Sequence, residues 1–207
     1  RKTIVLGGMT GSGKSFLLRR LNEMGEQFVD LERIANHKGS SFGALGEDAQ
    51  PSSEHFANLV HDKIQKLDRS KHFWLEDESK NIGSVFMPDE FYFNMQNAPT
   101  IVLLIDIDKR IPRLVSEYSL YPPEMLTEAV KRISKRLGGD NTREALGAIE
   151  SKDFAKAIKI TLSYYDKAYM YAINRKKREN LVFIESDTDD IEINAKKILE
   201  ASVTMRL

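Results

Sequence analysis

The chain has 207 residues, of which 41% are hydrophobic and 30% are charged, and this balance is typical of a single soluble globular domain. Lysine plus arginine and aspartate plus glutamate both number 31, which excludes the overall positive field that draws a protein onto nucleic acid, so any RNA contact must be local. The absence of cysteine excludes disulfides, thiolate zinc sites and a cysteine nucleophile within these residues.

No segment of the sequence has the length and apolar character of a membrane anchor. The longest apolar run, Ile101–Ile105, is too short to cross a bilayer, and the amino terminus lacks the apolar stretch of a signal peptide. We therefore expect a cytoplasmic protein that does not bind membranes. Because the chain begins with arginine rather than methionine, we also expect an excised domain or one piece of a larger protein.

The first residues predict a strand, a glycine-rich loop and a helix, in that order. Thr3–Leu6 is a short β-branched run that leads into the glycines. The helix that follows carries an apolar stripe made of Phe16, Leu17, Leu18 and Leu21. Residues 27–31 predict a second short strand. The polar, glycine-rich stretch from His37 to Ser53 predicts an irregular loop, and such loops often carry binding residues.

The remaining elements alternate between helix and strand. Residues 53–67 have helical spacing, with Ser53 as the expected cap, and they lead into a third strand at residues 72–75. The continuous apolar run Ile101–Ile105 predicts a strand buried on both faces, and Leu181–Ile184 predicts a fifth strand. This alternation predicts an α/β fold with an open, mainly parallel sheet of about five strands and helices on both faces.

A long helical insert, about residues 109–171, is predicted between the last two strands. We expect breaks in it at Pro122-Pro123 and at Gly138-Gly139, because proline and glycine interrupt helices. A closing helix is predicted over about residues 189–202. With the insert included, the sequence predicts one domain over residues 1–207.

The loop from Gly8 to Ser15 has the P-loop pattern G-x-x-x-x-G-K-S, which grips phosphate. Its glycines let backbone N–H groups turn inward onto phosphate oxygens, while Lys14 supplies a point charge and Ser15 supplies a hydroxyl for Mg²⁺. The predicted strand before it and helix after it indicate a P-loop NTPase-like fold. We predict phosphate contacts from Gly8, Thr10, Gly11, Ser12, Gly13, Lys14 and Ser15.

A P-loop needs an acidic residue at the end of a neighbouring strand to hold the water shell of the metal. After the apolar third strand come Glu76 and Asp77, and we predict that Asp77 or Glu76 acts beside Mg²⁺ together with Ser15. Asp30 and Asp106 are rivals, since parallel strands bring their carboxyl ends to one crevice. Each of these acids would equally suit a helix cap or the surface.

Several stretches of the sequence together resemble one known family, the P-loop domain of tRNA 2-selenouridine synthase. The resemblance runs from the first strand to about Tyr169, and its His-x-Gly-Ser-x-Phe-Gly and Glu-Asp-Glu-Ser segments are more distinctive than the P-loop itself. The stretches occur in the order Gly7–Ser15, Asp30–Glu32, His37–Gly43, Gln50–Ser52, Glu76–Ser79 with Ile82-Gly83, and Tyr164–Asp166.

The resemblance implies a two-part enzyme, in which a rhodanese-like domain with an essential cysteine precedes the P-loop domain. That enzyme adds a geranyl group from geranyl diphosphate to the sulfur of 2-thiouridine at the wobble position of certain tRNAs, and then replaces it with selenium from selenophosphate. This chain has no cysteine and no rhodanese-like segment, so we expect the carboxy-terminal half of a longer enzyme or one subunit of a split one. The implied partners are tRNA and a rhodanese-like domain or subunit.

The resemblance also implies a chemical role for the loop. Lys14, the loop amides and Mg²⁺ would stabilise the diphosphate as it departs, while the sulfur of the tRNA attacks the allylic carbon. Glu76 and Asp77 would act on the metal side of the same site. Substrate contacts are predicted from residues that follow the second, third and fourth strands, with an ordinary surface loop as the alternative: His37, Gly39, Ser40, Ser41, Glu78, Ser79, Arg110 and Arg113.

Basic clusters on the predicted helices are candidates for contact with tRNA phosphates, although a solvated helix face is the commoner meaning of such runs. One cluster consists of Lys131, Arg132, Lys135 and Arg136, and another covers Arg175–Arg178. The helical spacing of three tyrosines favours core positions over base stacking, and these are Tyr164, Tyr165 and Tyr169. A prenyl tail could contact four residues that would equally suit a core, namely Phe42, Phe56, Phe86 and Met87.

Two other functions remain open on the sequence alone. The fold and the loop would suit a small-molecule or nucleotide kinase, with the arginine-bearing insert as its lid. They would also suit a nucleotide-dependent module that positions RNA for a separate catalytic subunit. A guanine-specific GTPase is disfavoured, because no Asn-Lys-x-Asp motif follows a late strand.

Overall fold

The central sheet is built around the first strand, β1 (Thr3–Gly8). In the computed structural model, which describes residues 2–175 and 181–205, five parallel strands lie in the order β2-β3-β1-β6-β7. The other four are β2 (Phe28–Val29), β3 (Phe73–Glu76), β6 (Thr100–Ile105) and β7 (Leu181–Ser186). The predicted α/β fold with an open, mainly parallel sheet is confirmed. The carboxyl ends of these strands meet at one edge, where parallel α/β sheets bind ligands.

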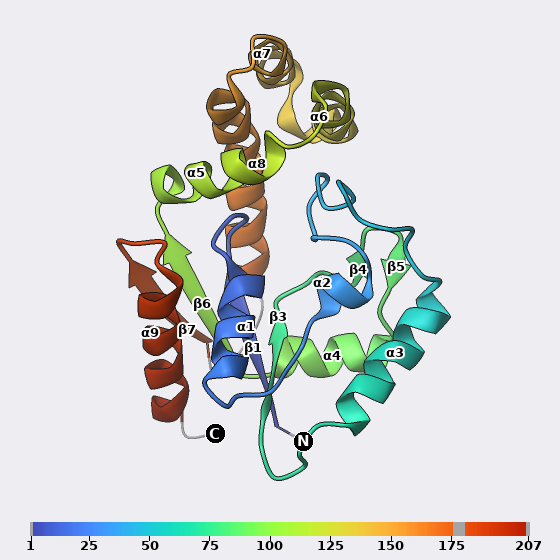
Figure 1. Cartoon of the computed structure of the whole chain (residues 1–207), viewed down its shortest axis with the longest axis vertical. Helices are drawn as coiled ribbons and strands as arrows, with labels where there is room; N and C mark the ends of the chain where they lie inside the picture. The colour runs from blue at the N-terminus through green and yellow to red at the C-terminus, as the bar shows by residue number, and fades with distance from the viewer. Residues whose placement is uncertain (1, 176–180, 206–207) are drawn as a thin grey trace.

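Helices cover both faces of the sheet, as the alternation of side chains along β1 requires (Figure 1). Ile4 and Leu6 pack with residues of α1 and α9, whereas Val5 packs on the other face with residues of α3 and α4. The bounds are α1 (Lys14–Glu23), α3 (Ser53–Gln65), α4 (Asp89–Asn97) and α9 (Ile191–Thr204). No helix of the described residues combines the length and the apolar character needed to cross a membrane.

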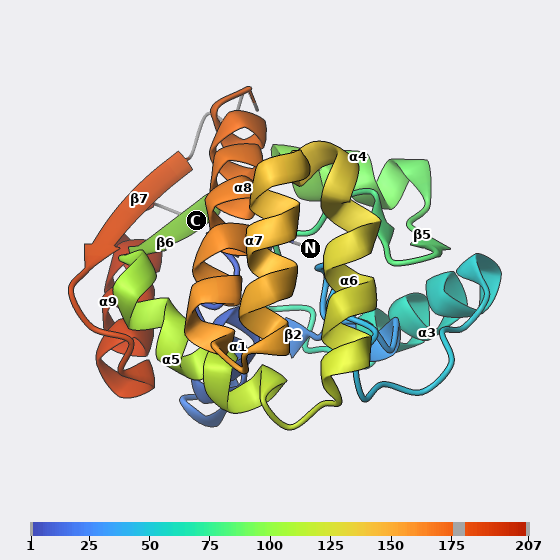
Figure 2. The same ribbon diagram turned by 90° about the horizontal axis from the view of Figure 1, so that it is seen from above.

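The insert between β6 and β7 is a group of helices above the carboxyl edge of the sheet (Figure 1, Figure 2). It consists of α5 (Ile107–Tyr118), α6 (Pro123–Leu137), α7 (Gly139–Glu150) and α8 (Phe154–Arg175). These helices share an apolar core of their own, which includes Leu126, Val130 and Leu162. The longest of them, α8, extends from the insert down beside the sheet, so it connects the insert to the sheet edge.

Both breaks predicted in the insert are confirmed. Pro123 is the first residue of α6, and Gly138, with a φ of 89°, separates α6 from α7. A third break lies at residues 151–153, between α7 and α8, where Lys152 has a φ of 60°. The sequence does not predict this break, because neither proline nor glycine marks it.

Short elements before β6 are also missing from the sequence prediction. A hairpin of β4 (Asn81–Ile82) and β5 (Val85–Phe86) is too short to show an alternating pattern. The helix α2 (Leu31–Ile34) is a single turn and is likewise too short to show a periodic pattern. The helix α4 lies in a stretch to which the sequence analysis assigns no element. At the start of α3 the cap is Ser52, not Ser53, because the Ser52 hydroxyl accepts the His55 N–H at 3.1 Å.

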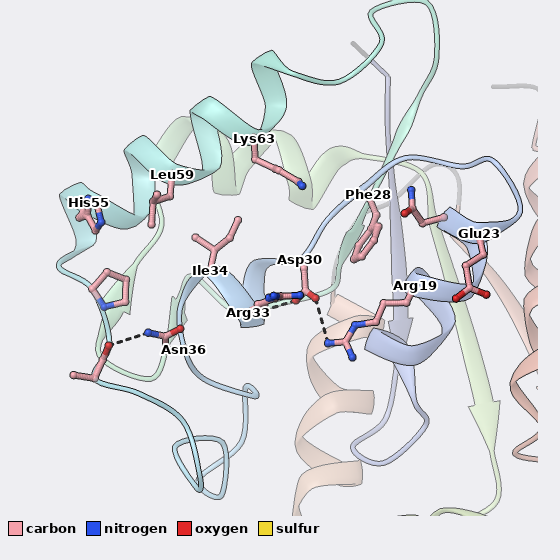
Figure 3. Close-up of a pocket in the computed structure, with 13 residues that line it drawn as sticks. Arg19, Glu23, Phe28, Asp30, Arg33, Ile34, Asn36, His55, Leu59 and Lys63 are labelled. Carbon is pink, nitrogen blue, oxygen red and sulfur yellow. Dashed lines mark hydrogen bonds and ion pairs between the residues drawn. The ribbon is translucent and has the colours of Figure 1, made fainter.

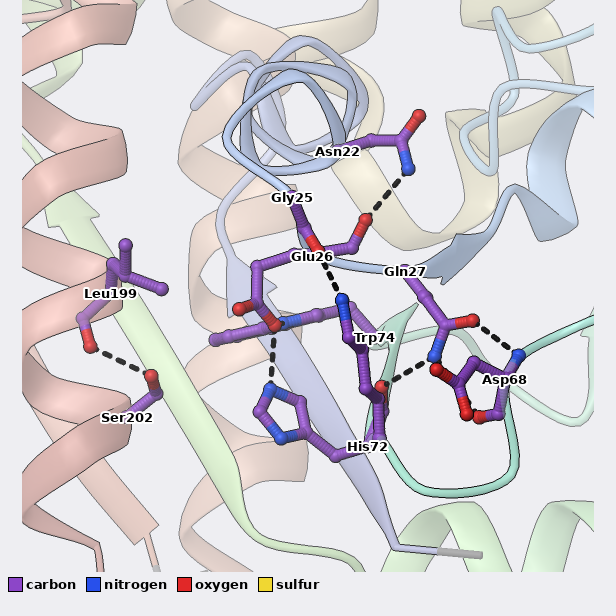
Figure 4. Close-up of polar contacts among 10 residues, drawn as sticks. Asn22, Gly25, Glu26, Gln27, Asp68, His72, Trp74, Leu199 and Ser202 are labelled. Atoms are coloured by element: carbon purple, nitrogen blue, oxygen red, sulfur yellow. Dashed lines mark hydrogen bonds and ion pairs between the residues drawn. The ribbon is translucent and has the colours of Figure 1, made fainter.

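The edge of the sheet opposite the P-loop is held by a partly buried polar contact (Figure 4). One carboxylate oxygen of Glu26 accepts a hydrogen bond from the indole N–H of Trp74 at 2.9 Å and lies 2.6 Å from Nε2 of His72. Gln27 also bonds there to the backbone of Asp68. We assign His72 no role from the sequence, and its contacts are structural: they fix the start of β3.

Candidate phosphate-binding site

The P-loop spans the turn from β1 to α1, at the carboxyl edge of the sheet. Gly11 and Gly13 have φ values of +82° and +79°, a region that glycine enters without steric cost. Lys14 donates a hydrogen bond from Nζ to the Gly8 carbonyl at 3.0 Å, so its charge lies across the loop. Ser12 is buried and its hydroxyl has no hydrogen-bond partner within the described residues. This is the shape of an anion-binding nest.

Two carboxylates flank the hydroxyl of Ser15. It lies 2.7 Å from Glu76 Oε1 and 2.9 Å from Glu32 Oε2, and the second oxygen of Glu76 accepts the Glu32 N–H at 3.3 Å. The acid closest to Ser15 is therefore Glu76, not Asp77, whose Oδ2 accepts from the Tyr169 hydroxyl at 3.2 Å. Glu32 is not among the site residues predicted from the sequence, although it lies in Asp30–Glu32, one of the stretches that carry the family resemblance.

The rival acids are helix caps. Asp30 caps α2 by accepting the Arg33 N–H at 2.9 Å, and Asp106 caps α5 by accepting the Asp108 N–H at 2.8 Å. Capping satisfies backbone donors that the helix itself leaves open. This is the alternative role that the sequence analysis allows for both residues.

The acids around Ser15 are crowded. Burial, followed by repulsion from Glu32 and Asp30, raises the pKa of Glu76 to about 8. Burial likewise raises the pKa of Glu32, and burial with repulsion from Glu32 raises that of Glu78 well above its usual range. Lys14 is the nearby cation that opposes these shifts. The carboxylates of Glu76 and Glu32 are hard oxygen donors, and the Ser15 hydroxyl lies between them. This arrangement fits Mg²⁺, which commonly binds one or two carboxylates together with phosphate oxygens and water.

A cavity of about 1110 Å³ opens over this loop, between the sheet edge and the insert. Several predicted residues from different parts of the sequence line it together. They are Gly8, Thr10, Gly11, Gly13, Lys14, Ser15, Gly39, Ser40, Asp77, Glu78, Ser79, Arg113 and Arg136. The structure thus brings most of the predicted phosphate and substrate residues to one place, although it does not test what they bind.

The sequence model of the family described as "tRNA 2-selenouridine synthase AAA domain" matches residues 1–200. The chain belongs to this family. The tRNA 2-selenouridine synthase of Sulfurovum sp. (strain NBC37-1) is 34% identical over 226 residues, which cover 95% of this chain and 60% of the relative. The protein of that name from Shewanella pealeana is 36% identical over 220 residues, which cover 87% of this chain and 56% of the relative. The chain thus spans less than two thirds of these relatives.

Among solved structures, the full-length tRNA isopentenylpyrophosphate transferase from Bacillus halodurans is similar over 99% of this chain and 98% of its own. The sequence identity is 11% and the TM-score is 0.48. A likeness at this level carries no functional argument.

In this tRNA 2-selenouridine synthase AAA domain, Arg110 has a different position from the one predicted. Its guanidinium is buried and makes a two-point ion pair with Asp166 at 2.6 and 3.0 Å. It also donates to the carbonyls of Thr10 and Ile105 at 2.8 and 2.9 Å. Arg110 does not line the cavity, so we revise its predicted role from substrate contact to support of the P-loop.

Two predicted residues of the loop after β2 also support the site rather than line it. His37 is buried, and its Nδ1 accepts the Gly39 N–H at 3.2 Å. Burial lowers the pKa of His37, which agrees with a neutral ring that accepts a hydrogen bond. Ser41 bonds through its N–H to the hydroxyl of Tyr165 at 3.1 Å. We revise both from substrate contacts to residues that position Gly39 and Ser40.

Arg113 remains next to the phosphate nest. Its Nη2 donates to the Asp189 carbonyl at 2.7 Å, whereas its buried Nη1 has no hydrogen-bond partner within the described residues. A Cβ atom built on Gly13 would lie 1.9 Å from that Nη1. The guanidinium thus has one anchored nitrogen and one nitrogen directed at the loop.

The insert supplies the apolar wall of the cavity, whose side chains are Leu114, Tyr118, Leu120, Tyr121, Tyr165 and Ala168. The insert also supplies the polar residues Arg113, Ser116, Glu117 and Arg136, and Leu114 lies close to Gly11 of the P-loop. Leu120 is 79% exposed, so its side chain lies at the open side of the cavity. None of the four residues predicted for a prenyl tail lines this cavity: Phe42, Phe56 and Met87 are buried in the core, and Phe86 is exposed elsewhere.

The sequence analysis misses this wall for a physical reason. Residues of α5 at helical spacing that face a cavity are indistinguishable from residues that face a core. Tyr165 and Tyr169, predicted as core residues, line the cavity instead. Phe42 contributes indirectly, because its ring stacks on Tyr118 at a centroid distance of 4.9 Å.

The basic face of α6 lies mostly outside the cavity. Lys131, Arg132 and Lys135 are exposed, and Lys131 pairs with Glu128 at 2.9 Å. Arg136 reaches the cavity, where it lies 3.5 Å from the Tyr164 hydroxyl. Of the second cluster, Arg175–Arg178, all but Arg175 lie outside the described residues. Contact of either cluster with tRNA stays a prediction.

Proposed function

We propose that this chain is the phosphate-binding domain of a tRNA-modifying transferase that binds geranyl diphosphate and presents it to the wobble 2-thiouridine of a tRNA. The observation that carries the proposal is the pairing of a P-loop with an apolar wall across one cavity of about 1110 Å³. A prenyl diphosphate has the same two characters, an anionic head and an apolar tail. The names of the relatives, tRNA 2-selenouridine synthase, support a tRNA acceptor.

The head of the ligand would lie against the P-loop. The loop amides and Lys14 would hold the diphosphate oxygens, and the Nη1 of Arg113 is placed to donate a hydrogen bond to one more of them. Ser15, Glu76 and Glu32 would hold Mg²⁺. When bound, this ion supplies positive charge that neutralises the charge developing on the diphosphate.

No side chain of the protein forms a covalent bond during the proposed transfer. The thiouridine sulfur forms a bond to the allylic carbon, and the bond from that carbon to the diphosphate oxygen breaks, so the electron pair leaves with the diphosphate. The cationic loop and Lys14 stabilise that leaving group. The apolar wall around Leu114, Tyr118 and Leu120 would hold the tail and keep water from the allylic carbon.

Exchange of the geranyl group for selenium from selenophosphate is assigned to the whole enzyme. The chain spans 60% of the relative from Sulfurovum sp., and it contains no cysteine. We propose that a rhodanese-like domain or subunit, with the cysteine implied by the resemblance, is the partner for that second step. The basic face of α6 remains our candidate for contact with the body of the tRNA.

The substitution Lys14→Ala tests the proposal. Calorimetric titration with geranyl diphosphate and Mg²⁺ should show tight binding to the wild type and binding at least about tenfold weaker in the variant, since a charged hydrogen bond is worth about 1.5–3 kcal/mol. Lys66→Ala, an exposed lysine after α3, is the matched control and should bind as the wild type does. Geranyl transfer to a thiouridine-containing tRNA that persists in Lys14→Ala would contradict the proposal.

The same titrations separate the other two functions. A kinase would bind ATP in preference to geranyl diphosphate and would transfer its terminal phosphate to a small molecule. A positioning module would bind tRNA and a nucleotide without any turnover of geranyl diphosphate.

A further inference from the structure

A second cavity, of about 980 Å³, adjoins the phosphate cavity (Figure 3). It lies between the carboxyl half of α1, β2, the turn of α2 and one side of α3. Arg19, Asp30 and Arg33 line both cavities, so one extended ligand can occupy both. We call this second cavity the α3 groove; its lining includes Arg19, Phe28, Arg33, Ile34, Leu59 and Lys63.

One wall of the α3 groove is a stripe of α3. His55, Leu59 and Lys63 recur every fourth residue, which places them on one face of the helix, and all three are exposed. Figure 3 shows Lys63 extending from α3 into the space that separates this helix from Asp30. The exposed stripe therefore faces another wall rather than a packed neighbour, which is why Leu59 remains 38% exposed.

The groove carries three cations, Arg19, Arg33 and Lys63, and two carboxylates, Glu23 and Asp30. Glu23 pairs with Arg20 of α1 at 2.9 Å. Arg19 is engaged, because its guanidinium lies 3.5 Å from the Asp30 carboxylate. In contrast, neither the Arg33 guanidinium nor the Lys63 ammonium makes an ion pair or side-chain hydrogen bond in the part of the chain that the structure describes. Two cations without a counterion, in a groove that opens to the phosphate nest, are suited to an anionic ligand that reaches both sites.

The opposite wall is partly apolar, with Phe28 and Ile34 half-buried against the core and lining the groove. Phe28 lies at the end of the groove nearest α1, and Ile34 lies between it and α3 (Figure 3). An aromatic ring beside unengaged cations is the combination with which proteins hold single-stranded nucleic acid: the ring stacks on a base and the cations contact the backbone phosphates.

We infer that the α3 groove binds the single-stranded RNA next to the nucleotide that enters the phosphate cavity, with phosphates at Arg33 and Lys63 and a base against Phe28. This inference rests on the proposed function, because an RNA acceptor must bring one nucleotide to the diphosphate while its neighbours occupy adjoining space. The two cavities together exceed the 300–1,000 Å³ that a single small ligand commonly fills. A connected strand accounts for both.

The test uses a fluorescein-labelled oligouridylate of eight nucleotides and measures its anisotropy over a range of KCl concentrations. Arg33→Gln combined with Lys63→Gln should weaken binding at least tenfold at low salt. It should also reduce the slope of log affinity against log salt by about 1.4, since each phosphate contact to a single strand contributes about 0.7. Phe28→Leu should weaken binding by about fivefold or more and leave the slope unchanged, because it removes stacking without removing charge.

The matched control is Lys109→Gln combined with Lys167→Gln, which removes the same charge from exposed positions that line neither cavity. This control variant should bind the oligonucleotide within about twofold of the wild type, and uridine monophosphate should compete far less well than the octamer. The inference is overturned if the groove variant binds RNA as the wild type does, if the control variant loses as much affinity, or if the mononucleotide competes as well as the octamer.

Titration of each variant with geranyl diphosphate and Mg²⁺ separates the inference from the proposed function. Lys63→Gln alone and Phe28→Leu, whose positions line only the α3 groove, should keep the wild-type affinity for this ligand. If geranyl diphosphate binds but the groove substitutions do not change the affinity for RNA, the RNA-groove inference fails and the proposed function stands. If RNA binding depends on the groove but the wild type does not bind geranyl diphosphate, the proposed function fails and the RNA groove stands.

Discussion

The side chains around Ser15 serve binding at the expense of stability. Glu32 from α2 is brought next to Glu76 and Glu78 at the end of β3, and burial and mutual repulsion raise the pKa of each. A group whose pKa is raised in the folded state costs stability as pH rises from its unfolded value toward its folded value. For Glu76 that interval extends from 4.5 to about 8, so the cost is present at neutral pH.

Glu76→Gln should therefore stabilise the metal-free protein and weaken its metal site. The amide has the shape of the protonated acid and cannot ionise, so we expect Tm at pH 7.5 without Mg²⁺ to rise by at least about 2 °C, the shift that roughly 1 kcal/mol gives in a protein of this size. The further rise in Tm caused by Mg²⁺ with pyrophosphate should shrink. Thermal unfolding followed by circular dichroism measures both. Glu200→Gln, which removes an exposed carboxylate on α9, should change neither; a lower Tm for metal-free Glu76→Gln would contradict the argument.

Gly13 is the residue at which backbone and side-chain constraints coincide. Its φ of +79° is costly for alanine, and a Cβ atom there would meet the guanidinium of Arg113. Gly13→Ala should lower the free energy of unfolding by more than the 1 to 2 kcal/mol of a left-handed residue, because it also displaces Arg113 from Asp189. Its affinity for pyrophosphate should fall at least tenfold.

Gly25 provides the control for Gly13, because its φ is +99° but nothing lies within 4 Å of the position of a Cβ atom. Gly25→Ala should show the backbone cost alone, about 1 to 2 kcal/mol in urea unfolding, with pyrophosphate affinity unchanged. Equal losses of affinity in the two variants would show that general destabilisation, not the nest, explains the effect of Gly13→Ala.

At the residue scale, the sequence predicts the part of the site that is contiguous. Gly8 to Ser15 form a pattern whose spacing alone dictates its chemistry. Arg113 was predicted at this site and lies there, but Arg110, predicted with it, pairs with Asp166 instead. Glu32 reaches the nest from another segment, and only the three-dimensional path of the chain decides which of many acids arrives there. Asp77 and Glu76 illustrate the limit: adjacent residues of a strand point to opposite faces, so a one-residue ambiguity changes which acid meets Ser15.

At the scale of elements, α8 holds the P-loop at two points. Asp166 binds Arg110, which donates to the Thr10 carbonyl, and the Tyr169 hydroxyl accepts the Gly8 N–H at 2.9 Å. These two residues of α8 are three apart and share one face of the helix. The loop is therefore braced by the last helix of the insert as well as by its own strand and helix.

Asp166→Asn should test that brace. Removing the charge partner of a buried arginine commonly costs about 3–5 kcal/mol, so we expect the free energy of unfolding in urea to fall by about 3 kcal/mol. The control is Asp108→Asn, which breaks the other α5–α8 ion pair, to Lys159. Both partners of that pair are exposed, so the loss should stay below about 1 kcal/mol. Similar losses in the two variants would exclude a special role for the buried pair.

Most of the longer elements were predictable, as was the short strand β2, whereas α4 and several short elements were not. The strands β1, β3, β6 and β7 are apolar runs, and the breaks at Pro122-Pro123 and Gly138-Gly139 follow from residues that interrupt helices. The hairpin of β4 and β5 and the single turn of α2 are too short to establish a period. The break at Lys152 depends on how α7 and α8 pack, which is a tertiary property.

At the scale of the whole molecule, the sheet edge and the insert each contribute one wall of the phosphate cavity. The sheet side carries Lys14, the Ser15 hydroxyl and the carboxylates, and the insert carries the apolar side chains, including Leu114 and Leu120, together with Arg113. Neither wall alone would bind a prenyl diphosphate. This division implies that a ligand with both characters draws the two walls together, whereas a ligand with an anionic head alone engages only one of them.

Hydrogen exchange measured by mass spectrometry should reveal that difference. With Mg²⁺ present, pyrophosphate and geranyl diphosphate should both slow exchange in peptides that contain Gly8–Ser15. Only geranyl diphosphate should slow exchange across residues 114–121, since its tail alone can pack against Leu114, Tyr118 and Leu120. Peptides from α9, which lines neither cavity, serve as the internal control and should not change. Equal protection of residues 114–121 by both ligands, or by neither, would mean that the apolar wall does not bind the tail, and the substrate would then have to be a phosphate compound without a prenyl chain.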